Sequence, residues 1–379
     1  MVFIERAIEN LVLNYLKPNK AVVILGARRV GKTELLKRIV SNWKGPYLFL
    51  NGDDFQVHEI FANRTVSNYK RLLGDIRFLV IDEAQSIPEI GMKIKLMLDT
   101  IDGLSVLLSG SSVFDLNNQL GEPLVGRKMT FHMFPLAQME FVKQENLMDT
   151  YQKLEERLIF GSYPELEQLG SRTEKMDYLY EQVNSYLLKD ILEFEGIRKR
   201  EIIVSLLKMI AFRVGSEISV EGLANELQLA RATVDRYLDL LSKVFIIHKL
   251  SGFSRNLDNE ITKKNKWYFY DNGIRNALIH NFNDSSLRDD MGRLWENFII
   301  SERLKKQEYK RIHASNYFWR THTKQEVDWV EERDGALFGY EFKWSPKKVP
   351  NAPALWSKAY TEAKFEVIHP KNYLDFVVD

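Results

Sequence analysis

The chain has 379 residues, of which 45% are hydrophobic and 28% are charged, and its formal net charge is +1. These values are typical of a globular protein of roughly two to four domains, and they exclude a global electrostatic attraction to nucleic acid or to an anionic membrane. The chain has no cysteine, which excludes disulfides and thiolate metal sites.

The N-terminal segment Met1–Leu16 places Glu5, Arg6 and Glu9 among apolar residues. Charges inside an apolar pattern predict an amphipathic helix and argue against a signal peptide. No apolar run in the chain approaches the roughly 20 residues of a transmembrane helix. We therefore expect a cytoplasmic protein that does not bind membranes.

A glycine-rich loop follows the apolar, β-branched segment Ala21–Leu25 and precedes a helical pattern. Its sequence fits G-x-x-x-x-G-K-[ST], and a position between strand and helix is the context in which this pattern binds phosphates. Backbone N–H groups of such a loop point at one anion, and the following helix adds the positive end of its dipole. We expect Lys32 to reach the β- and γ-phosphates of a nucleotide and Thr33 to hold Mg²⁺. The predicted phosphate-binding residues are Gly26, Ala27, Arg28, Arg29, Val30, Gly31, Lys32 and Thr33.

Short apolar runs alternate with helical patterns along the rest of residues 1–140. Strands that are apolar throughout, separated by helices, predict a parallel sheet covered on both faces. Ligands of such sheets bind beyond the carboxyl ends of the strands. The predicted strands are Tyr47–Leu50, Phe78–Ile81, Val106–Ser109 and Met129–Phe134, with a helix at Ile94–Ile101.

Four polar residues fall at or just past the carboxyl ends of two of these strands: Asp82, Glu83, Ser109 and Ser111. An acid in this position can bind Mg²⁺ through its water shell, so we predict that Asp82 is a metal ligand. A second acid beside it, Glu83, can orient or deprotonate the attacking water. Ser109 and Ser111 are expected either to hydrogen-bond to the γ-phosphate or the water, or to be turn residues.

The segments GARRVGKT, FLVIDEAQ, LLSGSSVFDL and GRKMTFHMFPL resemble the AAA-type ATPase module of a large bacterial and archaeal family. In that family the module is joined to a C-terminal region that ends in a restriction-endonuclease-like domain. The resemblance implies ATP as the ligand and a sensor role for a polar residue of Ser109–Ser111. It also makes Arg127 a candidate arginine finger, which stabilises charge on the transferring phosphoryl group. A finger acting in trans needs a homo-oligomer, and the alternative is an arginine that only forms a salt bridge.

Residues 205–284 show a helix–turn–helix pattern followed by two strands. Such a module can place its second helix in the major groove of DNA. Here the exposed face of that helix mixes arginines with aspartates, so its charge nearly cancels, which is poor for phosphate contact. We favour a packing or partner role over base recognition. The predicted helices are Val220–Leu227 and Arg231–Ser242, and the predicted strands are Phe245–Leu250 and Lys266–Tyr270.

The last region carries a β-hairpin pattern around Asp334–Gly335, a strong two-residue turn signal. The turn fixes a register that sets Asp328 opposite Glu341 and Glu326 opposite Lys343. Two facing carboxylates repel each other, and Mg²⁺ or Mn²⁺ between them would remove that penalty. Lys343 lies on the same face as Glu341, where it could position or activate a water for attack on a phosphodiester.

Asp328, Glu341 and Lys343 resemble the Asp…Glu-x-Lys core of PD-(D/E)xK nucleases. In that fold a glutamate on the preceding helix often joins the site, and Glu296 matches it by position. The alternative is a solvated hairpin face with a cross-strand salt bridge.

The predicted fold is α/β. It comprises a parallel-sheet P-loop AAA-type ATPase core at 1–140, a helical lid at 141–204, a winged-helix-like module at 205–284 and a C-terminal α/β restriction-endonuclease-like domain at 285–379.

Two classes of function remain. One is an ATP-hydrolysing enzyme that acts on DNA or RNA through its C-terminal domain, with ATP and Mg²⁺ at the loop and a second Mg²⁺ or Mn²⁺ at Asp328 and Glu341. The other is an ATP-dependent switch or scaffold whose nuclease-like domain is inactive and binds a protein partner. The intact Asp328, Glu341 and Lys343 favour the first class, whereas the nearly neutral net charge and the poorly basic second helix favour the second. The lysines and arginines of Glu302–Lys324 predict either a phosphate-facing patch or a soluble helix.

Overall fold

The structure is a computed structural model that describes residues 4–111, 124–187, 200–254, 264–345 and 349–378. The chain forms two compact units. The N-terminal unit comprises Phe3–Pro135 and Lys243–Phe245, and the C-terminal unit comprises Leu136–Ser242 and Ile246–Asp379. Within the described ranges no helix combines the length and the apolar character needed to span a bilayer.

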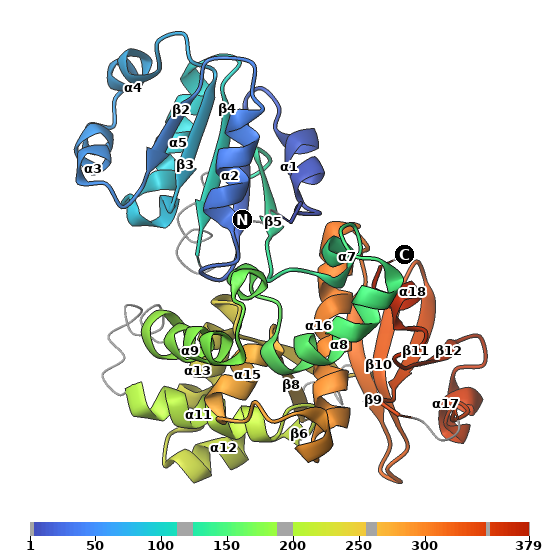
Figure 1. The fold of residues 1–379 in the computed structure, drawn as a ribbon. Coiled ribbons are helices and arrows are strands. Elements are labelled where there is room, and N and C mark those ends of the chain that lie inside the picture. Colours follow the sequence, from blue (N-terminus) through green and yellow to red (C-terminus); the bar gives the residue numbers. More distant parts are fainter. Residues whose placement is uncertain (1–3, 112–123, 188–199, 255–263, 346–348, 379) are drawn as a thin grey trace. The chain divides into compact units, whose positions relative to one another are not determined.

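Five parallel strands in the order β2-β3-β4-β1-β5 form the sheet of the N-terminal unit (Figure 1). Every residue of β3 and β4 is buried, as is β1 after its first residue, which confirms the parallel sheet predicted from the apolar runs. Because the strands are parallel, the carboxyl ends of β1, β3 and β4 meet at one edge. The strands are β1 (Lys20–Leu25), β2 (Leu48–Asn51), β3 (Phe78–Asp82), β4 (Ser105–Gly110) and β5 (Lys128–His132).

The helices of the N-terminal unit follow the apolar period where they cover the sheet. Leu35, Leu36 and Ile39 of α2 and Ile94 and Met97 of α5 are buried. Neither α3 nor α4 is predicted from the sequence, because each buries only two side chains and so has a weak apolar period. The helices are α1 (Glu9–Tyr15), α2 (Lys32–Ser41), α3 (Phe55–Ala62), α4 (Val66–Leu73) and α5 (Ile90–Thr100), with a 3₁₀ turn, η1 (Ala84–Ser86).

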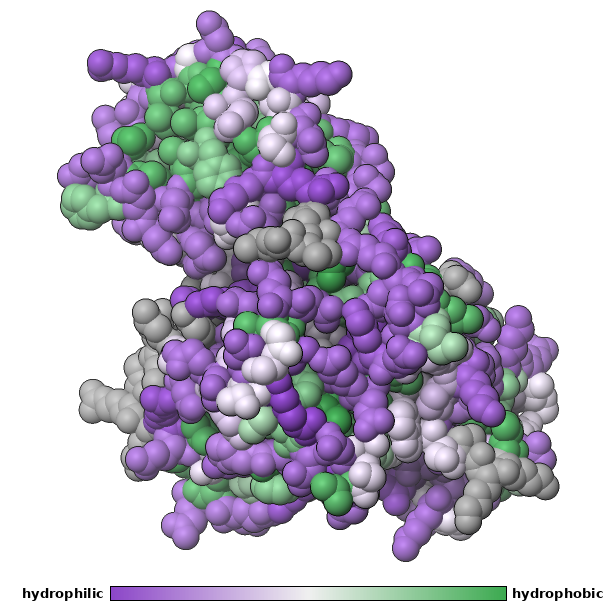
Figure 2. Space-filling view, in the orientation of Figure 1, coloured by the Kyte–Doolittle hydropathy of each residue, from purple (hydrophilic) through white to green (hydrophobic). Residues whose placement is uncertain are grey.

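The face shown in Figure 2 is mostly hydrophilic. Apolar residues gather on the N-terminal unit in the part of the view where Figure 1 shows β2 and α3. Phe55 and Ile60 of α3 are among the exposed apolar side chains of this part of the chain. Apolar atoms make up much of any protein surface, so this gathering alone defines no site.

A mixed sheet of seven strands, in the order β12-β11-β10-β9-β7-β8-β6, runs through the C-terminal unit. The hairpin β10–β11 has the register expected from its two-residue turn, with Arg333 opposite Ala336 and Trp329 opposite Tyr340. Strands β7 and β9 pair in parallel, which joins the two predicted wing strands, β7 and β8, to the last part of the chain. The strands are β6 (Glu217–Ile218), β7 (Ile247–Gly252), β8 (Asn265–Phe269), β9 (Ser315–Arg320), β10 (Glu326–Arg333), β11 (Ala336–Phe342) and β12 (Lys364–Ile368).

Helices surround this sheet, and α16 packs on β8 and β11 (Figure 1). The two helices of the predicted helix–turn–helix are present as α12 and α13. The helices are α7 (Gln138–Phe141), α8 (Leu147–Phe160), α9 (Arg172–Glu181), α11 (Arg200–Phe212), α12 (Val220–Leu227), α13 (Arg231–Lys243), α15 (Asn272–Leu278), α16 (Met291–Tyr309), α17 (Ala354–Ala359) and α18 (Tyr373–Val377). The 3₁₀ helices of this unit are η2 (Pro164–Gln168) and η4 (Ser285–Leu287), and η3 (Gln182–Leu187) is a π-helix.

The compact units do not divide at the predicted boundaries 204–205 and 284–285. One sheet runs through residues on both sides of the second boundary. The first predicted boundary, at residue 140, lies close to the division between Pro135 and Leu136. The lid, the winged-helix-like module and the nuclease-like domain remain proposals as separate domains.

Candidate functional site

The phosphate loop lies between β1 and α2. Gly31 caps α2 in a left-handed conformation with φ of +97°, which favours glycine. A Cβ on Gly26 would lie 2.1 Å from the carbonyl oxygen of Met133, so this position also needs glycine. The buried ammonium of Lys32 donates to the carbonyl oxygens of Gly26 and Ala27, each at 2.9 Å. The lysine therefore lies over the loop whose N–H groups would cradle a phosphate.

The ends of β3 and β4 join the phosphate loop through a chain of hydrogen bonds. Thr33 Oγ1 donates to Asp82 Oδ2 at 2.7 Å. Ser109 Oγ donates to Asp82 Oδ1, and the backbone N–H of Glu83 donates to Ser109 Oγ at 3.2 Å. The structure thus brings together predicted residues from three elements, and Ser109 orients the Asp82 carboxylate.

Glu83 is held by a residue that the sequence does not single out. Its backbone is left-handed, with φ of +49°, and its Oε2 accepts from Gln85 Nε2 at 2.6 Å. The same amide nitrogen lies 3.3 Å from Ser111 Oγ, which links the fourth predicted strand-end residue to the site. Gln85 lies two positions after Glu83, but the direction of its side chain depends on the 3₁₀ turn η1. The apolar pattern of the sequence does not predict that turn.

Arg6 is a second site residue that the sequence does not predict. Its side chain is buried, and it donates to the carbonyl oxygens of Val30 at 2.5 Å and of Phe134 at 2.7 Å. Val30 belongs to the phosphate loop and Phe134 follows β5, so Arg6 ties the loop to the neighbouring strand. In the sequence, Arg6 is recognisable only as a charged residue within an apolar segment. That pattern does not predict which groups the side chain contacts.

The oxygen donors at the loop fit a magnesium ion. The Thr33 hydroxyl and the Asp82 carboxylate lie 2.7 Å apart, and Mg²⁺ in proteins is typically held by one or two such groups with waters and substrate phosphates completing its shell. Within the described part of the chain, no group of three His, Cys, Asp or Glu side chains is arranged to hold a metal. An ion at the loop would therefore depend on a nucleotide for its remaining ligands.

The structure does not bring Arg127 to the phosphate loop of its own chain. The N–H of Ala21, at the start of β1, donates to the Arg127 carbonyl at 2.9 Å, whereas the loop follows Leu25 at the other end of that strand. The guanidinium of Arg127 pairs with Asp99. Arg127 therefore lies at the amino edge of the sheet, and a role as a finger in trans stays a prediction.

A second group of charged side chains lies in the C-terminal unit. We call it the acidic centre and define it by the carboxylates of Glu296 on α16, Glu326 and Asp328 on β10, and Glu341 on β11, with Lys266 and Tyr268 of β8 and Lys343 just beyond β11. The centre contains all four residues predicted for a nuclease-like site. It also contains two residues from β8, which precedes the predicted nuclease-like region.

Asp328 and Glu341 lie on neighbouring strands, as the predicted register requires. Asp328 Oδ2 accepts from the backbone N–H of Phe342 at 2.9 Å. Glu341 Oε1 pairs with Lys343 Nζ at 2.6 Å, while Glu341 Oε2 is buried and has no hydrogen-bond partner among the described residues. A buried carboxylate oxygen left in this state is costly, and a bound cation would satisfy it.

Lys266 is the most deeply buried cation of the acidic centre, with 2% of its side chain exposed. Its Nζ lies 2.5 Å from Glu326 Oε1 and 3.5 Å from Glu296 Oε1. Glu326, which the predicted register sets opposite Lys343, thus forms its ion pair with Lys266. The pairing of β10 with β9 has an irregularity between Val327 and Val330. Tyr268 donates its hydroxyl to Glu296 Oε1 at 2.6 Å.

Burial and mutual repulsion raise the pKa values of three acids in this centre. Burial raises the pKa of Glu296 to about 7, although Lys266 opposes the rise. Burial also raises the pKa of Asp328 and that of Glu341, and the Asp328 charge adds to the latter. Burial pulls the pKa of Lys266 down, but the carboxylates of Glu296, Asp328 and Glu326 outweigh it and raise that pKa above its ordinary value. The centre therefore favours bound cations.

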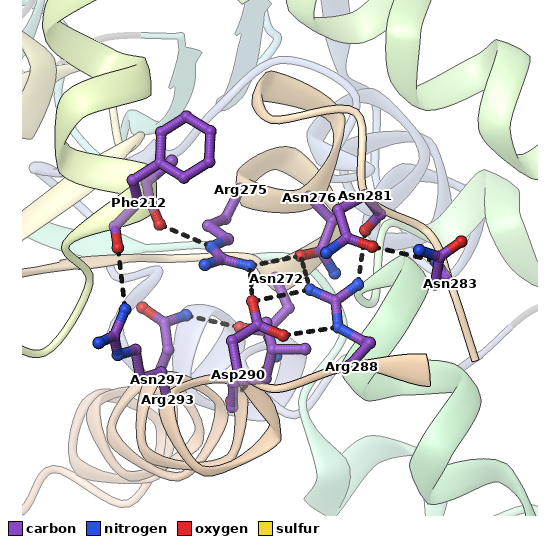
Figure 3. Close-up of polar contacts among 12 residues, drawn as sticks. Phe212, Asn272, Arg275, Asn276, Asn281, Asn283, Arg288, Asp290, Arg293 and Asn297 are labelled. Atoms are coloured by element: carbon purple, nitrogen blue, oxygen red, sulfur yellow. Dashed lines mark hydrogen bonds and ion pairs between the residues drawn. The ribbon is translucent and has the colours of Figure 1, made fainter. Parts of the chain in front are cut away.

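A buried polar network fixes the start of α16, the helix that carries Glu296 (Figure 3). Asp290 accepts from Arg275 at 2.6 Å and from two nitrogens of Arg288 at 2.8 and 2.9 Å. About two turns further along α16, Asn297 donates to the side chain of Asn272 at 2.7 Å. These contacts anchor α16 to α15 and so set the position of Glu296 relative to the sheet.

The first part of the basic stretch Glu302–Lys324 lies in α16. It is neither a phosphate-facing patch nor a solvent-exposed helix. Arg303 and Lys305 are buried within α16. Arg303 forms two hydrogen bonds to Glu331, at 2.6 and 2.8 Å, and Lys305 pairs with Glu302 at 2.7 Å. The prediction is wrong here because this part of the helix is enclosed by the fold, and cations paired inside it cannot reach a phosphate.

Three family models match successive parts of the chain. An AAA domain matches residues 18–142, a domain of unknown function (DUF8612) matches residues 151–285, and another domain of unknown function (DUF4143) matches residues 291–373. The first match and the loop geometry together support a P-loop ATPase domain of the AAA class at the N-terminus. The descriptions of the other two models name no activity.

Two similar proteins match most of this chain. The chain is 26% identical over 376 residues to the uncharacterized protein MJ1544 of Methanocaldococcus jannaschii, which covers 93% of this chain and 82% of the relative. It is 25% identical over 331 residues to the uncharacterized protein Rv2008c of Mycobacterium tuberculosis, covering 85% and 70%.

One similar solved structure is that of the Signal Transduction ATPase with Numerous Domains (STAND) protein with a tetratricopeptide repeat sensor, PH0952, from Pyrococcus horikoshii. It is 13% identical, with a TM-score of 0.32, and the match covers 80% of this chain but only 46% of that one. At this TM-score the likeness supports no conclusion about fold or function.

Proposed function

We propose that this chain hydrolyses ATP at the phosphate loop. The observation that supports this most is the contact between Thr33 and Asp82, because it joins the loop to the strand end where an acid and an attacking water are needed. Glu83 follows Asp82 directly and is oriented by Gln85.

Each residue has a distinct role in the proposed reaction. Lys32 would exchange its two carbonyl partners for the β- and γ-phosphate oxygens, which are stronger acceptors because they are charged. Thr33 and Asp82 would hold Mg²⁺, which neutralises charge on the phosphate oxygens when bound. Glu83 would orient the attacking water and accept its proton. Gln85 would keep the Glu83 carboxylate directed toward that water.

Phosphate release from ATP in the presence of Mg²⁺ tests this function. The comparison is between the parent protein and Glu83→Gln, which keeps the size of the side chain and its bond to Gln85 but removes the base. Release by the parent and its loss in the variant support the proposal, and equal release in both rejects the role of Glu83.

A second proposed function is metal-dependent cleavage of a phosphodiester at the acidic centre, with DNA or RNA as the substrate. It is supported by the buried, unpartnered Oε2 of Glu341 on the strand beside Asp328. Carboxylate oxygens such as those of Asp328 and Glu341 are suitable ligands for Mg²⁺ or Mn²⁺. Lys343, whose side chain is 43% exposed, is accessible enough to position a water.

Incubation of the protein with DNA and with RNA, in Mn²⁺ and with or without ATP, tests this second function. Cleavage that depends on Mn²⁺ and is lost in Lys343→Ala supports it. Absence of cleavage, with ATP hydrolysis intact, favours the alternative of an ATP-dependent switch or scaffold that binds a protein partner through an inactive centre. Arg231 and Asp235, both exposed on α13, lie 3.6 Å apart, and this balanced charge is poor for contact with phosphates.

A further inference from the structure

Lys266 reaches the acidic centre from a strand outside the region that the nuclease resemblance covers. It belongs to β8, which pairs with β7 and β6, whereas the acids that it contacts lie on α16 and β10. Its ammonium is almost completely buried and lies 2.5 Å from Glu326 and 3.5 Å from Glu296. A lysine in this position is part of the centre and not a surface charge.

The charges around Lys266 explain why it is there. Four carboxylates gather in the acidic centre, and Lys343 neutralises Glu341 from the exposed side. Without Lys266, the buried acids Glu296 and Asp328 would have no cation on the enclosed side, and unpaired buried charges are strongly unfavourable. Lys266 thus neutralises part of the carboxylate charge from inside the fold, as a bound divalent ion would.

We propose that Lys266 is an internal cation that competes with a divalent metal ion for the acidic centre. The inference rests on the proposed metal site at Asp328 and Glu341. An ion bound there would carry two positive charges close to the ammonium and would draw on the same carboxylates, so the two cations oppose each other. Metal affinity is therefore set by β8 as well as by the two ligand-bearing strands.

Glu341 Oε2 is the carboxylate oxygen that the lysines of the acidic centre leave for a metal ion. Lys266 pairs with Glu326 and Glu296, and Lys343 pairs with the other oxygen of Glu341. Neither lysine donates a hydrogen bond to Glu341 Oε2. The parent centre thus keeps one oxygen for a metal while its total negative charge is lowered, which predicts weak metal binding.

Calorimetric titration of the full chain with Mn²⁺ alone, without nucleotide, tests the inference. In Lys266→Met, which keeps a long side chain but removes the charge, we expect Mn²⁺ to bind at least about tenfold more tightly than in the parent. Asp328→Asn is introduced into the parent and into Lys266→Met, and only the Mn²⁺ binding that it abolishes is assigned to the acidic centre. Mn²⁺ that binds at the phosphate loop is unaffected by Asp328→Asn and is thereby separated. Lys305→Met is the matched control, because Lys305 is another buried lysine paired with a carboxylate. It should leave the Mn²⁺ affinity unchanged.

The double variant Lys266→Met with Glu326→Gln removes one positive and one negative charge together, so that the fold is preserved if the single variant is unstable. The double variant should also bind Mn²⁺ more tightly than the parent. Equal affinity in the parent and both variants, still abolished by Asp328→Asn, would overturn the role of Lys266 and leave the metal site standing. Mn²⁺ binding that Asp328→Asn does not affect in any background would reject the metal site, and the inference with it.

Discussion

The Thr33 hydroxyl lies 2.7 Å from the Asp82 carboxylate, so the first turn of α2 and the end of β3 meet at a single hydrogen bond. Around this contact lie the lysine of the phosphate loop, a serine that holds the same carboxylate and the acid that follows it. Three separate stretches of sequence supply these groups. Their convergence is the structural basis for proposing ATP hydrolysis.

Replacement of Lys32 tests nucleotide binding. Lys32→Ala should raise the Kd for ATP by about 10- to 100-fold, because charged hydrogen bonds to phosphate are each worth roughly 1.5–3 kcal/mol. Lys37→Ala is the control, since Lys37 lies on the same helix but pairs with Glu34 at an exposed position. Isothermal titration calorimetry measures both, and an unchanged Kd in Lys32→Ala would rule out this role.

A role for Arg127 in trans predicts a dependence on protein concentration. ATP turnover per subunit should rise as the protein is concentrated, and Arg127→Ala should remove that rise. Asp99→Ala breaks the same salt bridge without removing the arginine, so it should keep the rise. Turnover that stays flat with concentration, in a protein that sediments as a monomer, would refute the finger.

The acidic centre predicts a stabilising substitution. Burial raises the pKa of Asp328, so its ionised form costs stability at neutral pH. Asp328→Asn should therefore raise the melting temperature without metal, by roughly 2–4 °C for each 1 kcal/mol gained, and should abolish stabilisation by Mn²⁺. Glu332→Gln, an exposed site on the same strand, should do neither. If Mn²⁺ leaves the parent unchanged and Asp328→Asn melts at a lower temperature, the residues form a structural salt-bridge face.

His248 predicts a loss of stability in mild acid. Both ring nitrogens are buried without hydrogen-bond partners among the residues that the structure describes, and burial lowers the pKa of His248 from 6.5 to about 3. The unfolded chain therefore binds a proton between these values while the folded chain does not, so this group lowers stability as the pH falls from 6.5, by up to about 1.4 kcal/mol per pH unit.

His248→Phe keeps the ring between Tyr268 and Tyr270 and should make the melting temperature less sensitive to pH between 7 and 5. His313→Gln, at an exposed position, should retain the parent's sensitivity. Identical pH dependence in the parent and His248→Phe would show that the buried ring does not contribute.

The local parts of the account could be predicted from the sequence. The phosphate loop is defined by neighbouring residues, and the hairpin register from Trp329 opposite Tyr340 to Arg333 opposite Ala336 follows from the two-residue turn at Asp334–Gly335. The parallel sheet follows from strands that are apolar throughout.

Contacts between distant segments could not be predicted in this way. The role of Arg6 depends on the meeting of the N-terminal segment with Val30 and Phe134. The role of Lys266 depends on the pairing of β7 with β9, which places β8 in the same sheet as β10. Periodicity reports which face of an element is apolar, but it does not report which other element lies against that face.

The measurement that tests the proposed ATPase most directly is ATP binding and turnover by Glu83→Gln beside the parent. Glu83 would act on the attacking water, and Lys32 on the phosphates that are already bound. The variant should therefore bind ATP with the parent's affinity and turn it over about 10²-fold more slowly, while Glu34→Gln, an exposed acid on α2, keeps the parent rate. Turnover by Glu83→Gln equal to that of the parent would contradict the proposed mechanism.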